Sequence, residues 1–155
     1  IFEMDCDFSH NPEDLIQLYN ACVIDGGDLA IGSRYKSGVN VVNWPMGRVL
    51  MSYYASAYVR FITGLDIRDT TSGFKCYTRK VLETIDLGAI KFKGYAFQIE
   101  MKFTAAKFGF NIVEVPIIFT DRQEGESKMN GGIFKEAIFG VVQMKMKSWF
   151  KKYKI

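Results

Sequence analysis

The sequence is poor in the residues that build structural metal sites and cross-linked folds. Its 155 residues include one histidine and three cysteines, and no two cysteines have the CxxC spacing of a zinc site. Because a structural zinc ion needs about four nitrogen or sulfur ligands, the sequence argues against such a site. We expect Cys6, Cys22 and Cys76 to be free thiols.

Long uncharged apolar runs are missing as well. The most apolar predicted helix, residues 45–63, contains Arg48 and Arg60, and these charges argue against a membrane span. No internal repeat and no low-complexity segment is found. With 48% hydrophobic and 24% charged residues, the composition is typical of one folded domain with a core.

Acidic residues are absent from the last eleven positions, which contain five lysines. Removing these five positive charges changes the formal net charge from +3 to −2. Such a tail suits an anionic membrane surface, a nucleic acid, or water alone. Because Trp149, Phe150 and Tyr153 accompany the lysines, we expect attachment to a membrane surface and no nucleic-acid partner. The alternatives are an apolar helix face that belongs to the core, or a solvated tail.

The hydrophobic pattern predicts alternating strands and helices. Strands are expected at residues 1–4, 28–32, 74–77 and 112–119, and helices between residues 9 and 25 and at 45–63, 79–85, 95–108 and 134–153. The first strand–helix–strand unit predicts a parallel pair of strands with a right-handed crossover. Pro116 places the last strand near an edge. We therefore predict an α/β fold with a mostly parallel sheet and flanking helices.

Asp5 and Asp7 directly follow the first predicted strand. Ligand sites of open α/β sheets lie at the carboxyl ends of strands. Two carboxylates one residue apart can hold Mg²⁺ or Mn²⁺ together with the phosphates of a nucleotide. In sugar transfer, such an ion neutralises the charge that builds on the departing diphosphate. The same pattern also occurs as a turn or a helix cap, so the triplet alone leaves both interpretations open.

Residues 4–13, MDCDFSHNPE, closely resemble the MDADxSHxPE segment of the polyprenol-phosphate (dolichyl-phosphate) mannose synthases, which are family-2 glycosyltransferases with a GT-A fold. Further matches follow in the family's order: Gly32-Ser33-Arg34-Tyr35, Trp44-Pro45 with Arg48 and Ser52, Arg68-Asp69, Ser72-Gly73-Phe74, Arg122, and Gly125-Glu126-Ser127-Lys128. Several motifs in one order, over about the first 130 residues, make the resemblance specific.

The resemblance implies a GT-A-like (Rossmann-like) domain that transfers mannose from GDP-mannose to a polyprenyl phosphate with inversion, using Mg²⁺ or Mn²⁺. It implies that Asp5 and Asp7 bind the metal and the donor diphosphate and that Arg122 joins them in catalysis. Ser9 stands where some members have a glutamine metal ligand. The acceptor phosphate is expected against Arg34, Arg48 and Ser52. Three residues of the polar loop 121–132 are expected to reach the phosphate groups: Arg122, Ser127 and Lys128.

The chemistry of the residues agrees with this interpretation. Two anionic substrates can share one cleft only if fixed cations lie there, and the planar fork of arginine suits phosphate. A phosphate nucleophile is already ionised near neutral pH, since its second pKa is about 6, so no strong general base is needed. Each residue also has a structural alternative. Arg34 can be solvated, Arg48 can pair with a surface acid, His10 can be structural beside a helix cap, Ser72-Gly73 can form a turn, and Glu100 can be an exposed helix acid.

In this family the metal-binding pair normally lies far into the chain, after a nucleotide-binding half. We therefore expect residues 1–132 to be the carboxyl-terminal part of the GT-A domain and 133–155 an amphipathic basic helix. We expect a cytoplasmic protein, peripheral at the cytoplasmic membrane face, with a membrane-anchoring partner protein as a further expectation, and no nucleotide affinity in these residues alone. The alternatives are a related transferase that uses UDP-glucose or another donor, and an inactive fragment that binds a membrane surface or a partner.

Overall fold

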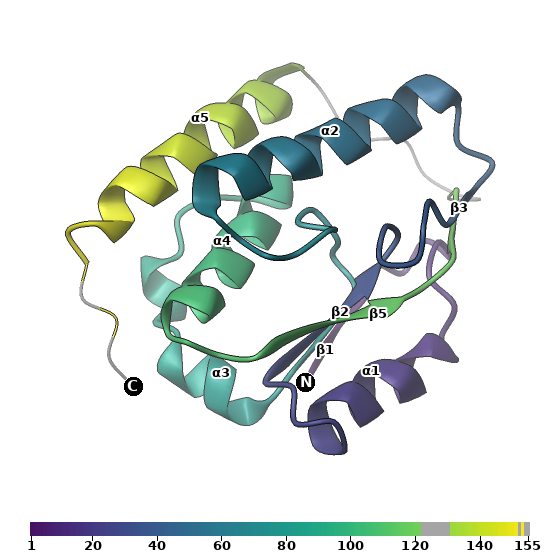
Figure 1. Ribbon diagram of the computed structural model, residues 1–155, viewed down its shortest axis with the longest axis horizontal. Helices are drawn as coiled ribbons and strands as arrows, with labels where there is room; N and C mark the ends of the chain where they lie inside the picture. The colour runs from purple at the N-terminus through teal and green to yellow at the C-terminus, as the bar shows by residue number, and fades with distance from the viewer. Residues whose placement is uncertain (122–130, 152, 154–155) are drawn as a thin grey trace.

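The computed structural model describes residues 1–121, 131–151 and 153, in which strands and helices alternate along the chain (Figure 1). The strands are β1 (Phe2–Glu3), β2 (Leu29–Ser33), β3 (Val41–Val42), β4 (Lys75–Tyr77), β5 (Ile112–Pro116) and β6 (Phe119–Thr120). The helices are α1 (Asp14–Val23), α2 (Met46–Thr63), α3 (Arg79–Thr84), α4 (Gly94–Lys107) and α5 (Gly131–Ser148), with a 3₁₀ turn at Leu87–Ala89. The predicted α/β class is confirmed.

The main sheet has the order β1-β4-β2-β5. β4 is antiparallel to both β1 and β2, while β2 and β5 are parallel. Three of the four strands therefore run in the same direction. The strand–helix–strand pattern predicts that β1 and β2 are neighbours, but β4 lies between them. The reason is β4, which offers a hydrogen-bonding edge to each of them, and this strand order is not visible in local sequence.

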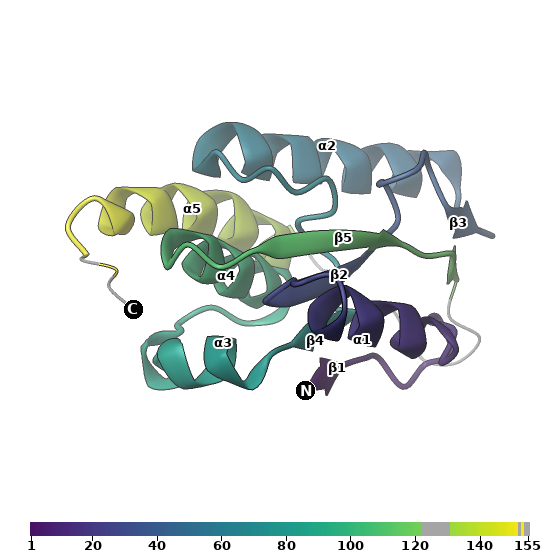
Figure 2. The same cartoon turned by 60° about the horizontal axis from the view of Figure 1, so that its bottom comes forward.

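Helices cover both faces of this sheet (Figure 2). On one face, α1 packs Leu18 and Cys22 against Ala30 of β2 and Cys76 of β4. The opposite face is covered by α2, α4 and α5, whose side chains form the larger core with Leu29 and Ile31. Neighbouring residues of β2 thus point to opposite faces and are all buried, as expected of a central strand. The three cysteines are free thiols, as predicted.

α2 begins and ends at the residues that the sequence predicts. Pro45 precedes the first turn, and Gly64 ends the helix with φ of 77°, where its N–H donates to the Arg60 carbonyl. The predicted limits of this helix are confirmed.

The predicted last strand is divided in two. β5 lies at an edge of the main sheet, as Pro116 predicts, and the chain then moves away to form β6. β6 pairs in parallel with β3 in a small second sheet that the sequence pattern did not indicate, because each strand has only two residues.

The last helix ends earlier than predicted. α5 stops at Ser148, whose hydroxyl donates to the Lys145 carbonyl, and the next two N–H groups, of Trp149 and Phe150, bond three residues back. These tighter bonds close the helix, so the prediction of one helix to residue 153 is wrong. Val141 and Met144 of α5 are buried in the larger core. Within the described residues, none of the helices combines the length and apolar character that crossing a bilayer requires. The division of the chain at residue 132 stays a prediction.

Candidate active site

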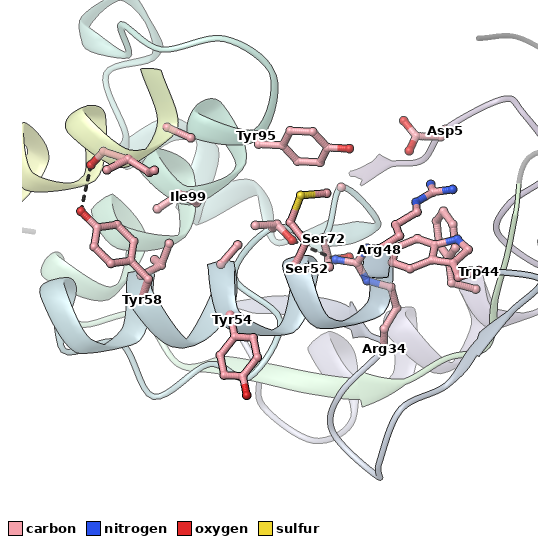
Figure 3. Close-up of a pocket in the computed structure, with 18 of the residues that line it drawn as sticks. Asp5, Arg34, Trp44, Arg48, Ser52, Tyr54, Tyr58, Ser72, Tyr95 and Ile99 are labelled. Carbon is pink, nitrogen blue, oxygen red and sulfur yellow. Dashed lines mark hydrogen bonds between the residues drawn. The ribbon is translucent and has the colours of Figure 1, made fainter. Parts of the chain in front are cut away.

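A pocket of about 380 Å³ opens where β1 and β2 end and β4 begins. Its polar wall comes from strand ends, loops and the start of α2: Asp5, Asp7, His10, Arg34, Arg48, Ser52, Thr71 and Ser72. Its apolar wall comes mainly from α2, α4 and α5: Met51, Ala55, Tyr58, Val59, Ile99, Ala137 and Ile138. Figure 3 shows Asp5 and Arg48 at one end and Tyr58 and Ile99 toward the other.

Asp5 and Asp7 lie in the pocket wall after β1. The loop turns sharply here, because Phe8 has φ of 61° and the Asp7 carboxylate accepts hydrogen bonds from the N–H and the hydroxyl of Ser9, at 3.2 and 2.5 Å. On the other side, a Cβ added to Gly73 would lie 3.8 Å from the Asp5 carboxylate. Residue 73 therefore lies in van der Waals reach of the Asp5 carboxylate.

The two carboxylates fit a hard divalent cation, since Mg²⁺ and Mn²⁺ prefer oxygen ligands and take the rest from phosphates and water. In the part of the chain that the structure describes, no cluster of three or more His, Cys, Asp or Glu side chains accompanies them. Ser9 is buried and donates to Asp7, and it is not part of the pocket wall. A part of Ser9 in metal binding stays a prediction, whereas its hydrogen bond orients the neighbouring carboxylate.

Arg34 follows β2 and is held in a buried ion pair. Its Nε and Nη2 donate to the two carboxylate oxygens of Asp69 at 2.7 and 2.6 Å, and Nη2 also donates to Thr71. Asp69 is fully buried and Arg34 is 7% exposed, so the alternative of a solvated arginine is wrong. Burial alone would raise the pKa of Asp69, but the charge and hydrogen bonds of Arg34 outweigh it and hold this pKa below its ordinary value.

Arg48 and Ser52 lie one helical turn apart on α2, and both line the pocket. The Arg48 guanidinium lies 4.0 Å from the centre of the Trp44 ring and donates to Asp121 at 2.7 Å. The pairing of Arg48 with an acid is thus confirmed, but it occurs in the pocket wall and leaves the arginine 28% exposed in its side chain. The stack and the ion pair together fix where this positive charge lies.

His10, the one histidine, is 4% exposed, and its ring stacks on Phe74 with centroids 4.7 Å apart. Burial lowers its pKa, against the opposing effect of Asp5 and Asp7. The packed ring agrees with the structural role that we predicted, but the residue also lines the pocket.

Two buried lysines behind the pocket were missed by sequence reasoning. Lys102 of α4 donates to the carbonyls of Thr70 and Ser72 at 2.9 and 2.6 Å, so it holds the loop that enters β4. Lys75 of β4 pairs with Glu3 at 2.9 Å and contacts Gln98. For Lys102 the available signal was a lysine among the mostly apolar residues 101–106, which is unusual for a helix that packs on a core.

The other expected residues divide into three groups. Ser72 lines the pocket and donates to the Gly32 carbonyl at 2.6 Å, so it combines turn and pocket positions. Glu100 accepts from the N–H groups of Lys91 and Phe92 and does not line the pocket. Three residues lie outside the described part of the chain: Arg122, Ser127 and Lys128.

No family model matches the chain. It is 50% identical over 143 residues to a polyprenol monophosphomannose synthase of Mycolicibacterium smegmatis, and 47% identical over 143 residues to an undecaprenyl-phosphate mannosyltransferase of Micrococcus luteus. These alignments cover 92% of this chain, and 54% and 58% of the relatives. A dolichol-phosphate mannosyltransferase of Pyrococcus furiosus is 40% identical over 83% of this chain and 35% of its own length.

The chain is a homologue of the polyprenyl-phosphate mannosyltransferases. The resemblance that the ordered motifs indicate is confirmed, and these homologues are glycosyltransferase enzymes. The chain spans about half the length of the mannosyltransferases from M. smegmatis and M. luteus.

Proposed function

We propose that this protein transfers mannose from GDP-mannose to a polyprenyl phosphate with inversion at the anomeric carbon, and that it uses Mg²⁺ or Mn²⁺. The observation that carries the proposal is the composition of one pocket. Asp5, Asp7, Arg34 and Arg48 share its polar part, and an apolar wall continues from them. A lipid phosphate has the same two parts, an anionic head and a hydrocarbon tail.

The reaction needs positioning more than proton transfer. An oxygen of the acceptor phosphate attacks the anomeric carbon of mannose, the bond between that carbon and the donor diphosphate breaks, and GDP leaves with the electron pair. The divalent ion, when bound, supplies charge neutralisation on the departing diphosphate. Asp5 and Asp7 are the residues that would hold it. Arg48 and Ser52 would hold the acceptor phosphate, with Arg34 beside them.

Both arginines already have a carboxylate partner, which limits the role of each. Arg34 directs Nε and Nη2 to Asp69, so Nη1 is the part of its guanidinium with no partner among the described residues. Arg48 is more exposed, and its ion pair with Asp121 can be exchanged for a phosphate at smaller loss. We therefore assign the larger share of acceptor binding to Arg48.

Attachment to a membrane surface is part of the proposal. Several large apolar side chains lie exposed on α5 and just after it: Phe139, Val142, Met146, Trp149 and Phe150. Lys147 and Lys151 are exposed in the same region, so apolar insertion and attraction to anionic lipid can act together. We propose a peripheral position at the cytoplasmic face, where a membrane-anchoring partner protein would strengthen the attachment.

Product formation tests the proposal. The protein, expressed from its complete open reading frame, is given radiolabelled GDP-mannose, Mn²⁺ and undecaprenyl phosphate, and the lipid product is counted. We expect product from the wild type and at least a hundredfold loss in Asp5→Asn and in Asp7→Asn, because one carboxylate cannot hold the ion and the diphosphate alone. A panel with UDP-glucose separates the donor alternatives. Absence of product with every donor would favour the membrane- or partner-binding alternative.

A further inference from the structure

His10 forms part of the pocket wall but has no hydrogen-bond partner among the residues that the structure describes. The residue is 4% exposed, and Nδ1 is enclosed without a partner. Buried polar atoms of native proteins are nearly always hydrogen-bonded. Nε2 is not among these enclosed atoms and no described residue pairs with it, so its partner is expected to be a ligand in the pocket.

The ring is fixed in one orientation by aromatic packing. It stacks on Phe74 at 4.7 Å and meets the edge of Phe119 at 5.1 Å between ring centroids. Since Nδ1 is enclosed and the residue lines the pocket, the nitrogen that a molecule in the pocket can reach is Nε2. A nitrogen held so rigidly loses little conformational entropy when it forms a hydrogen bond.

The charges nearest to the ring identify the ligand chemistry. Asp5, Asp7 and Arg34 all act electrostatically on the ring, and all three line the same pocket. Carboxylates that hold a divalent ion and an arginine fork both select phosphate oxygens. Phosphate is therefore the ligand class that this part of the pocket fits.

We propose that His10 is a substrate-binding residue whose Nε2–H donates a hydrogen bond to a phosphate oxygen, from the lipid phosphate or from the donor diphosphate. This inference rests on the proposed function, since it assigns a contact to the same site.

Substitution by phenylalanine separates binding from packing. Phe keeps an aromatic ring between Phe74 and Phe119 and removes both nitrogens. We expect His10→Phe to melt at the same or a higher temperature than the wild type, and its kcat/KM to fall about ten- to hundredfold, the range for a lost hydrogen bond to a charged group. His10→Gln places an amide N–H near Nε2 and is expected to restore most of this loss, whereas His10→Asn, which mimics Nδ1, is not.

Kinetics also identify which phosphate is bound. A KM that rises for undecaprenyl phosphate and not for GDP-mannose assigns the contact to the lipid phosphate, and the reverse assigns it to the diphosphate. Wild-type kcat/KM in His10→Phe would overturn the proposal. Restoration by Asn and not by Gln would overturn the assignment to Nε2.

A second measurement is independent of turnover. ¹⁵N NMR of the imidazole is recorded while farnesyl phosphate or GDP is added, and the His10 signals are assigned by their loss in His10→Gln. We expect the Nε2 signal to move with one of the two ligands and Nδ1 to move little. If both ligands bind, as seen from other signals, while both His10 nitrogens stay unchanged, the proposal is wrong. If the wild type forms no mannosyl lipid but Nε2 still responds, the proposed reaction fails and the phosphate contact stands.

Discussion

Arg34 and Asp69 meet through two short hydrogen bonds in a place almost closed to water, and this buried pair lies directly beside the pocket. The pair also ties the end of β2 to the loop that enters β4, because the Arg34 N–H donates to the same carboxylate at 3.0 Å. At the scale of single residues, the polar wall is therefore an arrangement of charges that compensate one another.

Removing one member of this pair should destabilise the protein strongly. We expect Asp69→Asn to lower the free energy of unfolding by about 3–5 kcal/mol, because the buried Arg34 charge loses its partner. The measurement is urea denaturation at pH 7. Glu83→Gln, which breaks the exposed Arg79–Glu83 pair, is the control and should change the free energy by less than about 0.5 kcal/mol.

The Arg34–Asp69 pair should also make the free energy of unfolding depend on pH in the acid range. The folded-state pKa of Asp69 is below its ordinary value, so its stabilisation is complete above about pH 4 and is lost as the pH falls through the folded-state pKa. Asp69→Asn should therefore show a flatter acid limb when the free energy of unfolding is plotted against pH. An acid limb as steep as that of the wild type would contradict this assignment.

The buried Lys102 should make the free energy of unfolding depend on pH in the alkaline range. Burial holds its pKa well below the ordinary value, so between the folded-state pKa and about pH 10 the unfolded chain binds more protons than the folded one. The free energy of unfolding should therefore rise with pH in this window. We expect a smaller rise in Lys102→Met, with part of it remaining because burial also lowers the pKa of Lys75. An unchanged rise would show that another group is responsible.

At the scale of elements, the structure shows which patterns can be interpreted from sequence. α2 was predictable because Pro45 and Gly64 mark its ends and the residues between them are largely apolar. The end of α5 was not, because it depends on the Ser148 hydroxyl and on three-residue hydrogen bonds that propensity does not indicate. β3 and β6 have too few residues for any periodicity.

The glycine that ends α2 offers a direct test at this scale. Gly64 has φ of 77°, which an L-residue adopts only with strain, so Gly64→Ala should lower the free energy of unfolding by about 1 kcal/mol. Gly47 is the matched control, because it lies in the same helix with open space around its Cα. Gly47→Ala should raise stability by up to about 1 kcal/mol through helix propensity. Equal effects in thermal melts would contradict the argument.

At the scale of the whole molecule, the site depends on contacts between distant parts of the chain. The end of β1, the end of β2, the start of α2 and the loop before β4 meet in one pocket. Several members were predicted through the ordered motifs: Asp5, Asp7, Arg34, Arg48 and Ser52. The partners Asp69 and Lys102 were not assigned their roles, because their contacts join positions more than 30 residues apart and leave no local pattern.

The membrane attachment that we propose is tested at the scale of the whole molecule. We expect binding to vesicles with anionic lipid to weaken as the salt concentration rises from about 0.05 M to about 0.5 M, because ions screen the lysine–lipid attraction. Lys147→Gln with Lys151→Gln should weaken binding, measured by vesicle co-sedimentation. Lys36→Gln with Lys80→Gln changes the charge equally at exposed positions elsewhere and serves as the control. Binding that ignores both salt and the tail lysines would contradict the proposal.

Because Arg48 stacks on Trp44, the intrinsic fluorescence of Trp44 should report on ligand binding in the pocket. Trp44 is one of two tryptophans, and the other, Trp149, is 69% exposed beyond α5. In Trp149→Phe, indole fluorescence within these residues comes from a ring in direct contact with the guanidinium. Any anion that draws the guanidinium off the ring will change the emission. Binding at the site can therefore be followed by tryptophan fluorescence without a labelled substrate.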